Sequence, residues 1–215
     1  MPLKIVSAGP SRSFPSGEGE LAAAASAAEG LLVIGSEAGR AWAQLADVDD
    51  QSFSAIELGM ECLAEHTGLE ASSRAERTVG FARFRMGDAA PTGLIELVRQ
   101  PWTRREAVAA AQSVFESAGF VVAICADFPG RIVDRLIRPY LNAVLRRLDE
   151  QLASAEDLDA TLRMGLGYPE GPLALLNRTG LAHHFDVTEV LHRALGGSDY
   201  LPARRAQVAK SRSVS

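Results

Sequence analysis

The stretch from Asp127 to Leu152, DFPGRIVDRLIRPYLNAVLRRLDEQL, divides this chain into two parts of different character. Pro129 suits the first position of a helix, because the missing N–H group is not needed there. Beyond it, apolar residues recur at the three- and four-residue spacing that places one apolar stripe along a helix. The positions are Ile132, Val133, Leu136, Ile137, Tyr140, Leu141, Val144, Leu145, Leu148 and Leu152. Strand-like runs end at Asp127, so we expect an all-helical part after it.

The later sequence continues the helical pattern. Ser154 followed by Asp157 predicts a helix start, because a serine hydroxyl caps the free N–H groups of a first turn. Gly165 and Gly167 are expected to end that helix, and Gly171-Pro172 to open a short one. A last helix is predicted from about Asp186 to Leu195, and the basic residues 201–215 are expected to form a flexible tail.

Before Asp127, short strand-like runs alternate with helix-like runs. This alternation predicts an α/β layer with a largely parallel sheet. In the last predicted helix of this part, Thr103 and Glu106 have the spacing of a capping box. We therefore expect an α/β domain over residues 1–126 and a helical domain over 127–200. Strands are predicted at 3–7, 31–34, 53–58, 78–84, 94–98 and 120–125, and helices at 18–29, 39–46 and 103–118.

Composition limits the class of protein. Of the 215 residues, 47% are hydrophobic and 23% are charged, which is typical of a globular fold. The net charge of -5 argues against nucleic-acid binding. Two cysteines, Cys62 and Cys125, are too few for a disulfide framework and suit a reducing compartment. Apolar runs stay below membrane-spanning length and the start lacks a signal-peptide pattern, so we expect a cytoplasmic protein without membrane or nucleic-acid partners.

The segment from Asp127 to Leu181 resembles the C-terminal domain of L-3-hydroxyacyl-CoA dehydrogenases. The resemblance is carried by the motifs PGRIVDR, PYLNA, ASAEDLDA and GYPEGP. Residues 78–127 also follow this family, residues 1–77 do so faintly, and the final residues are similar to the end of its longer, two-half members. The resemblance implies a shortened Rossmann-like parallel sheet, followed by a helical domain that dimerises and closes an acyl-CoA cleft.

The family passes a hydride between NAD and a 3-hydroxyacyl thioester. A histidine in the motif H-F-F-N-P takes the hydroxyl proton, and a glutamate pairs with that histidine. In this chain Ala82 stands at the histidine position, and an alanine cannot act as a general base. Glu96 stands at the glutamate position. Without a histidine beside it, we expect Glu96 to be a solvated strand residue.

Two further site positions depart from the family. Its asparagine, which holds the substrate carbonyl, is replaced by Asp134, and an ionised aspartate only accepts hydrogen bonds. We expect Asp134 to form a surface ion pair with a neighbouring arginine. Thr67 corresponds to a family serine, and His66 beside it is a candidate replacement base or, by default, a solvent-facing loop histidine. The candidate arginines are Arg131, Arg135 and Arg138.

A glycine pattern that resembles a dinucleotide fingerprint occurs at residues 17–22, GEGELA. Gly17 and Gly19 open a predicted helix, and Glu37 follows the next strand, where an acid can hold a ribose hydroxyl. However, Glu18 and Glu20 place negative charge where a pyrophosphate would lie. We therefore expect NAD binding to be weak or absent. The histidines lack cysteine or aspartate at metal-ligand spacing, so no metal site is predicted.

The leading hypothesis is a 3-hydroxyacyl-CoA dehydrogenase-like protein of fatty-acyl or aromatic-acid catabolism. Its hydride transfer would be lost or weak, and its acyl-CoA cleft and dimerisation would be retained. One alternative is an active NAD-dependent dehydrogenase that uses a rearranged base such as His66. Another is a structural partner of a full-length dehydrogenase. We expect a homodimer formed through residues after 127, because the long helix has a wide apolar stripe.

Overall fold

The computed structural model describes residues 3–24, 29–46 and 51–213. The chain forms two compact units. One comprises Met1–Arg85 and Ala90–Arg131, and the other comprises Met86–Ala89 and Ile132–Ser215. The boundary therefore lies after Arg131 rather than at 127. The short segment 86–89 belongs with the helices, and the amide of Asp88 lies 3.4 Å from the carbonyl oxygen of Thr179.

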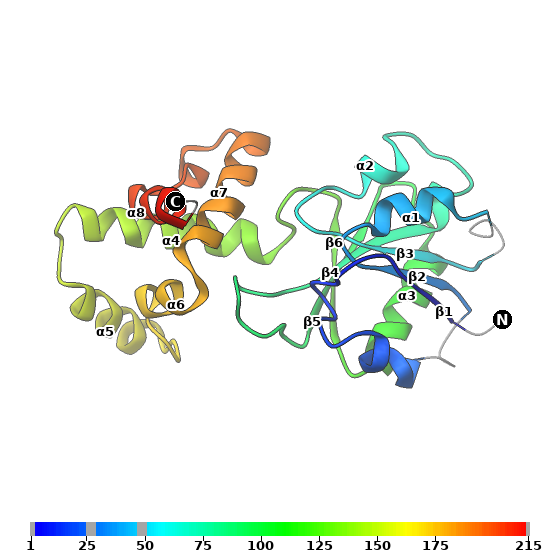
Figure 1. The fold of residues 1–215 in the computed structure, drawn as a ribbon, viewed down its shortest axis with the longest axis horizontal. Coiled ribbons are helices and arrows are strands. Elements are labelled where there is room, and N and C mark those ends of the chain that lie inside the picture. Colours follow the sequence, from blue (N-terminus) through cyan, green and yellow to red (C-terminus); the bar gives the residue numbers. More distant parts are fainter. Residues whose placement is uncertain (1–2, 25–28, 47–50, 214–215) are drawn as a thin grey trace. The chain divides into compact units, whose positions relative to one another are not determined.

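The α/β unit contains a six-stranded sheet whose strands lie in chain order (Figure 1). All neighbouring strands are parallel except β4 and β5, which are antiparallel. This confirms the prediction of a largely parallel sheet. The strands are β1 (Lys4–Ser7), β2 (Leu31–Ile34), β3 (Ser54–Glu57), β4 (Thr78–Arg83), β5 (Leu94–Arg99) and β6 (Val121–Ala126).

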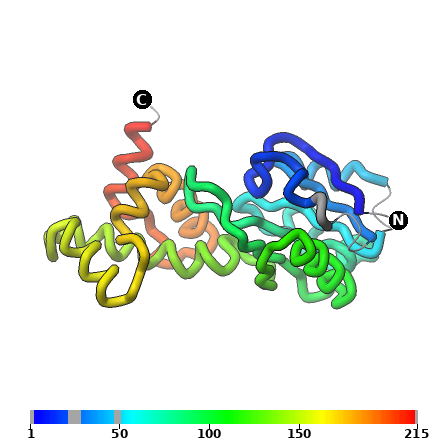
Figure 2. The backbone as a smooth tube through the Cα atoms, turned by 90° about the horizontal axis from the view of Figure 1, so that it is seen from below, coloured from blue at the N-terminus to red at the C-terminus, as the bar shows by residue number. Residues whose placement is uncertain are grey.

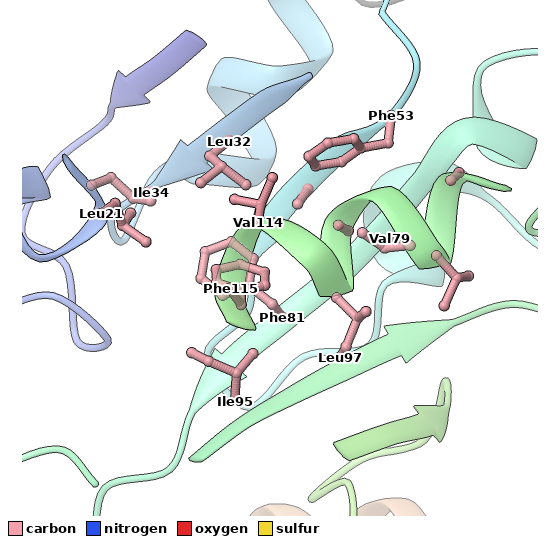
Figure 3. Packing of buried hydrophobic residues seen from close by; sticks show 14 of the residues in the cluster. Leu21, Leu32, Ile34, Phe53, Val79, Phe81, Ile95, Leu97, Val114 and Phe115 are labelled. Carbon is pink, nitrogen blue, oxygen red and sulfur yellow. The ribbon is translucent and has the colours of Figure 1, made fainter. Parts of the chain in front are cut away.

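Alternate residues of β2 face two separate apolar clusters, because successive side chains of a strand point to opposite faces. Leu32 and Ile34 pack in one cluster with η1 (Glu18–Ala24) and α3 (Arg105–Ser117). Figure 3 shows this cluster, with Val114 and Phe115 of α3 lying over Phe81 and its neighbours. Leu31 and Val33 pack in the other cluster with α1 (Ala38–Gln44). The helical elements η1 and α1 thus cover opposite faces of the sheet.

Two local predictions for this unit differ from the structure. The segment Glu18–Ala24 is a 3-10 helix, and residues 25–28, over which the predicted helix continues, lie outside the described residues. Thr103 does not cap α3, whose N-cap is Arg104 without a side-chain hydrogen bond. Instead, the hydroxyl of Thr103 accepts a hydrogen bond from the amide of Gln100 at 2.9 Å, within the turn that precedes the helix. Two short elements, α2 (Ala64–Thr67) and η3 (Ala75–Arg77), connect β3 to β4.

The second unit is helical, as predicted. The Ser154 hydroxyl accepts a hydrogen bond from the Asp157 amide at 3.0 Å, which confirms the predicted cap, and Gly167 ends that helix in a left-handed conformation. Among the described residues, no helix is both long and apolar enough to cross a membrane. The elements are α4 (Val133–Asp149), α5 (Ala155–Leu166), α6 (Pro172–Thr179), α7 (Leu181–Leu195), η4 (Ser198–Tyr200) and α8 (Arg204–Ser213).

Three helix boundaries differ from prediction. The long helix α4 begins at Val133, because the preceding Arg131 has a left-handed φ of 50°. Helix α7 begins at Leu181, well before Asp186, and Gly165 lies inside α5. The expected flexible tail is also wrong, since it forms α8 at the red end of the trace (Figure 2). Ion pairs hold this helix, among them Arg205 with Asp149 at 2.7 Å and Lys210 with Asp186 at 2.7 Å.

Candidate active site

Ala82 and Glu96 face each other across the antiparallel pair β4 and β5. Directly opposed residues project their side chains to the same face of a sheet. Ala82 is 5% exposed and Glu96 is 2% exposed, so both lie inside the unit. The strand register therefore places the two expected site positions opposite each other, and the Ala82 position carries only a methyl group. The prediction that Glu96 is solvated is wrong.

Glu96 has a cationic partner in Arg131, whose Nε lies 3.4 Å from the Glu96 Oε2. Arg131 is 9% exposed, and its Nη2 donates to the carbonyl oxygen of Gly59 at 2.9 Å. A buried carboxylate needs a compensating charge, and the guanidinium supplies it. In the described part of the chain, Nε and Nη1 of Arg131 have no hydrogen-bond acceptor. Among the described residues, Glu96 and Arg131 therefore form a buried ion pair with two unsatisfied hydrogen-bond donors.

Two thiols lie near this ion pair. Burial raises the pKa of Cys125 to about 11, and the Glu96 and Asp127 carboxylates act in the same direction. Burial also raises the pKa of Cys62 to about 11, again with a contribution from Asp127. Both cysteines are therefore protonated at neutral pH and are poor nucleophiles. Among the described residues, no three His, Cys, Asp or Glu side chains gather as metal ligands.

His66 and Thr67 lie on helix α2 rather than in a loop. The imidazole packs on Gly39, where an added Cβ would lie 2.1 Å from the ring. Its Nε2 is 3.6 Å from a carboxylate oxygen of Glu61. Burial alone would raise the pKa of Glu61, but its contact with His66 and hydrogen bonds from backbone amides outweigh burial and lower that pKa to about 2. Thr67 donates to the side-chain oxygen of Gln100 at 2.9 Å. These contacts hold the His66 ring against Gly39 and Glu61, although its Nε2 has no hydrogen-bond partner among the described residues.

Asp134 lies in the helical unit and forms the predicted ion pair, with Arg138 Nε donating to its Oδ1 at 2.8 Å. The prediction of a surface location is wrong, because Asp134 is 7% exposed. Arg138 Nη1 lies 3.1 Å from His184 Nδ1, and His184 Nε2 lies 3.0 Å from the Asn142 side-chain oxygen. Since arginine only donates, His184 Nδ1 accepts and the ring is neutral. Burial and the Arg138 charge lower the pKa of His184 to about 3.

A third buried acid, Glu57, was not singled out from the sequence. It ends strand β3 and is 5% exposed. Its carboxylate accepts hydrogen bonds from the Ser11 hydroxyl at 2.7 Å, the Ser13 amide at 2.7 Å and the Gly35 amide at 2.6 Å. The available sequence signal is the acidic residue at the end of an otherwise apolar strand, FSAIEL.

The residues expected to bind NAD do not form a dinucleotide cradle. An added Cβ on Gly17 or Gly19 would meet nothing within 4 Å, so no contact within the described chain requires a glycine at either position. Glu37 is exposed and pairs with Arg40 at 3.1 Å. A pyrophosphate is normally bound by backbone N–H groups after the first strand, where the strand order reverses. Here the order of the described strands does not reverse, and Glu57 accepts from one N–H group after β1, that of Ser13, and from one after β2, that of Gly35. The residues present do not fit the cofactor.

A Rossmann-like sheet joined to a bundle of helices is the architecture of a family of dehydrogenases. Residues 130–212 match the family model of the 3-hydroxyacyl-CoA dehydrogenase C-terminal domain. The helical unit therefore belongs to the 3-hydroxyacyl-CoA dehydrogenase family, which confirms the resemblance found in the sequence. Residues 78–127, which also resemble this family, form the predicted two strands, helix and further strand, observed as β4, β5, α3 and β6.

Relatives of known sequence and structure support this assignment. The chain is 33% identical over 110 residues to a probable 3-hydroxybutyryl-CoA dehydrogenase of Deinococcus radiodurans, covering 51% of this chain and 40% of the relative. It is 38% identical over 113 residues to the 3-hydroxyadipyl-CoA dehydrogenase of Escherichia coli, covering 53% and 23% respectively. The crystal structure of (S)-3-hydroxybutyryl-CoA dehydrogenase from Ralstonia eutropha has the same fold, with a TM-score of 0.72 and 22% identity over 90% of this chain and 68% of that one. The chain thus matches less than half the length of these two sequence relatives.

Proposed function

We propose that the chain is a 3-hydroxyacyl-CoA dehydrogenase-like protein of fatty-acyl or aromatic-acid catabolism whose own hydride transfer is lost or weak. It would bind acyl-CoA in the cytoplasm as a homodimer. The observation that carries the proposal is Ala82 in register with Glu96. Oxidation of a hydroxyl group requires that its proton be removed as the hydride leaves, and a methyl group cannot accept that proton.

The pair formed by Glu96 and Arg131 supports binding without proton removal. The pair is close to neutral, because the two charges lie 3.4 Å apart. The Nη1 donor of Arg131 is buried and has no acceptor among the described residues, and a carbonyl oxygen, which only accepts hydrogen bonds, would satisfy it. An acyl thioester offers such an oxygen. This corner of the molecule is therefore better suited to bind an acyl group than to oxidise one.

The alternative of an active dehydrogenase with His66 as base has weaker support. The His66 ring packs against Gly39 and lies 3.6 Å from Glu61, and Glu57 accepts from the Ser13 and Gly35 amides at the edge where a pyrophosphate would bind. A role as a structural partner of a full-length dehydrogenase remains the second candidate. It is favoured by the exposed apolar side chains of the helical unit, such as Met164, which is 84% exposed.

Binding measurements distinguish the proposal from the active-enzyme alternative. In calorimetry, acetoacetyl-CoA is expected to bind in the micromolar range, about −8 kcal/mol. NADH is expected to bind no tighter than about millimolar, about −4.1 kcal/mol, because Glu57 holds the donors that a pyrophosphate requires. Free coenzyme A is the control for contacts made by the nucleotide part alone. Micromolar NADH binding would contradict the proposal and favour the alternative.

The helical unit has an apolar surface that suits a homodimer. Helix α5 has no fully buried residue, and a groove of about 400 Å³ lies between it and α4. The groove includes the exposed Leu152 and is lined mainly by apolar atoms from Tyr140, Ala143, Val144, Leu158 and Leu162. Leu166, at the end of α5, is 57% exposed. Burial of such a surface against a second copy would stabilise a dimer.

Light scattering is expected to give twice the mass of the single chain at about 10 µM, well above the dissociation constant of a nanomolar dimer. Leu152→Glu together with Met164→Glu should yield monomers, because Leu152 lines the groove and Met164 is an exposed apolar side chain of α5. Leu69→Glu is the matched control, since Leu69 is 82% exposed but lies in the α/β unit. A wild-type monomer, or a dimer that survives the double substitution, would refute this interface.

A further inference from the structure

Glu57 is a buried anion surrounded by hydrogen-bond donors. Its Oε1 accepts from the Ser13 amide, and its Oε2 accepts from the Ser11 hydroxyl and the Gly35 amide. The donors come from two separate turns, one after β1 and one after β2. In the described part of the chain, no lysine or arginine pairs with this carboxylate. Its charge is therefore balanced by backbone and hydroxyl dipoles, which are groups that commonly bind anions in proteins.

The two turns close tightly around the carboxylate. An added Cβ at Gly35 would lie 2.3 Å from the carbonyl oxygen of Ala8, so the turns are in backbone contact. The Ser36 amide donates to the Pro10 carbonyl at 2.9 Å and fixes this contact. Phe14, at the end of the first turn, is 1% exposed and packs in the apolar cluster with α3. The turn after β1 is thus anchored on both sides of Ser11 and Ser13.

The carboxyl ends of parallel strands are where open α/β sheets bind phosphates and other ligands. Glu57 ends β3, and it reaches across β2 to the turn after β1, so its carboxylate lies at this edge. We propose that Glu57 is the permanent, internal ligand of an anion site, and that a small carboxylate or inorganic phosphate takes its place when the side chain is removed. This inference rests on the proposed function in one respect: both hold that no dinucleotide binds at this edge of the sheet.

The test is chemical rescue of Glu57→Ala. Removal of the carboxylate leaves two buried N–H groups without acceptors, and the melting temperature is expected to fall by about 5 °C or more. Sodium formate or acetate at about 100 mM should restore at least half of that loss by binding the vacated site, whereas sodium chloride at the same ionic strength should not. Inorganic phosphate forms a separate arm, which shows whether the site admits a tetrahedral anion.

Wild type and Glu76→Ala are the controls. Glu76 is an acid paired with Arg104 on the surface, and its removal leaves no enclosed site. Neither protein should distinguish formate from chloride. If Glu57→Ala does not fold, Glu57→Gln replaces it. The glutamine side chain would place an NH2 group against the Gly35 amide, so the melting temperature should fall. Formate should have no effect on this variant, because the glutamine side chain still fills the site.

An unchanged melting temperature in Glu57→Ala and Glu57→Gln would overturn the inference, as would equal responses of Glu57→Ala to formate and chloride. These readouts do not involve turnover, so they separate the inference from the proposed function. Rescue by formate together with measurable hydride transfer would refute only the proposed function. Absence of rescue together with absent turnover would refute only the internal-ligand site.

Discussion

The purified chain is expected to oxidise 3-hydroxybutyryl-CoA and 3-hydroxyadipyl-CoA with NAD or NADP at less than one hundredth of the typical enzyme rate of about 10 s⁻¹. This expectation rests on the proposed function, in which two parts of the hydride-transfer machinery differ from those of the family. Ala82 stands at the position that the resemblance assigns to the base, opposite a glutamate that is paired with Arg131. The N–H groups after β1 and β2 are bound to Glu57. Loss of a general base alone typically reduces a rate by about 10² to 10⁴.

Restoring the family residues should not restore activity. Ala82→His combined with Asp134→Asn returns two family side chains but leaves Glu57 and Arg131 in place. Groups that act as a unit do not contribute additively, so partial repair is expected to give no measurable gain. The assay follows NADH absorbance from about pH 6 to about pH 10, with a family dehydrogenase as positive control. Wild-type turnover close to the typical rate would show that the site has been misinterpreted, and Glu96, His66 and Thr67 would then be substituted first.

The second large effect is expected at the buried ion pair. Arg131→Met should lower the free energy of unfolding by about 3–5 kcal/mol, because it leaves the Glu96 carboxylate buried without its cation. Glu96→Gln in the same chain should recover most of this loss, since the neutral amide needs no counter-charge. A double-mutant cycle measured by urea unfolding gives the coupling between the two side chains.

Arg104→Met is the matched control for this cycle. Arg104 pairs with Glu76 on the same unit, but the Arg104 side chain is 48% exposed. Exposed ion pairs contribute about 0–1 kcal/mol, so its removal should change stability little. If Arg131→Met lowers the free energy of unfolding no more than Arg104→Met does, then Arg131 does not compensate the charge of Glu96.

Features that depend on local sequence were predictable. The Ser154 cap requires only Asp157 three residues later, and the apolar stripe of α4 follows from helical spacing alone. The strand at Leu31–Ile34 is apolar throughout, and both of its faces are covered by separate clusters. In each case the sequence of the element itself is sufficient to predict the element.

Features that depend on distant partners were not predictable. Helix α8 has a strongly polar sequence, and it is held by Asp149 of α4 and Asp186 of α7. The burial of Asp134 depends on α7, which contributes His184 to the same network. Likewise, the role of Glu57 depends on Ser11 and Ser13, which are far from it in sequence. The fold brings the residues of each pair together, so the sequence around one residue does not predict the other.

The opposite placement of η1 and α1 has a consequence for the handedness of the sheet. The connections from β1 to β2 and from β2 to β3 both advance one strand in the same direction, yet their helices cover opposite faces. Two such connections must have opposite hands, although about 98% of parallel crossovers are right-handed. One of the two connections therefore departs from the usual hand. Because the strands lie in chain order, β1 is an edge strand with β2 as its only neighbour among the described strands.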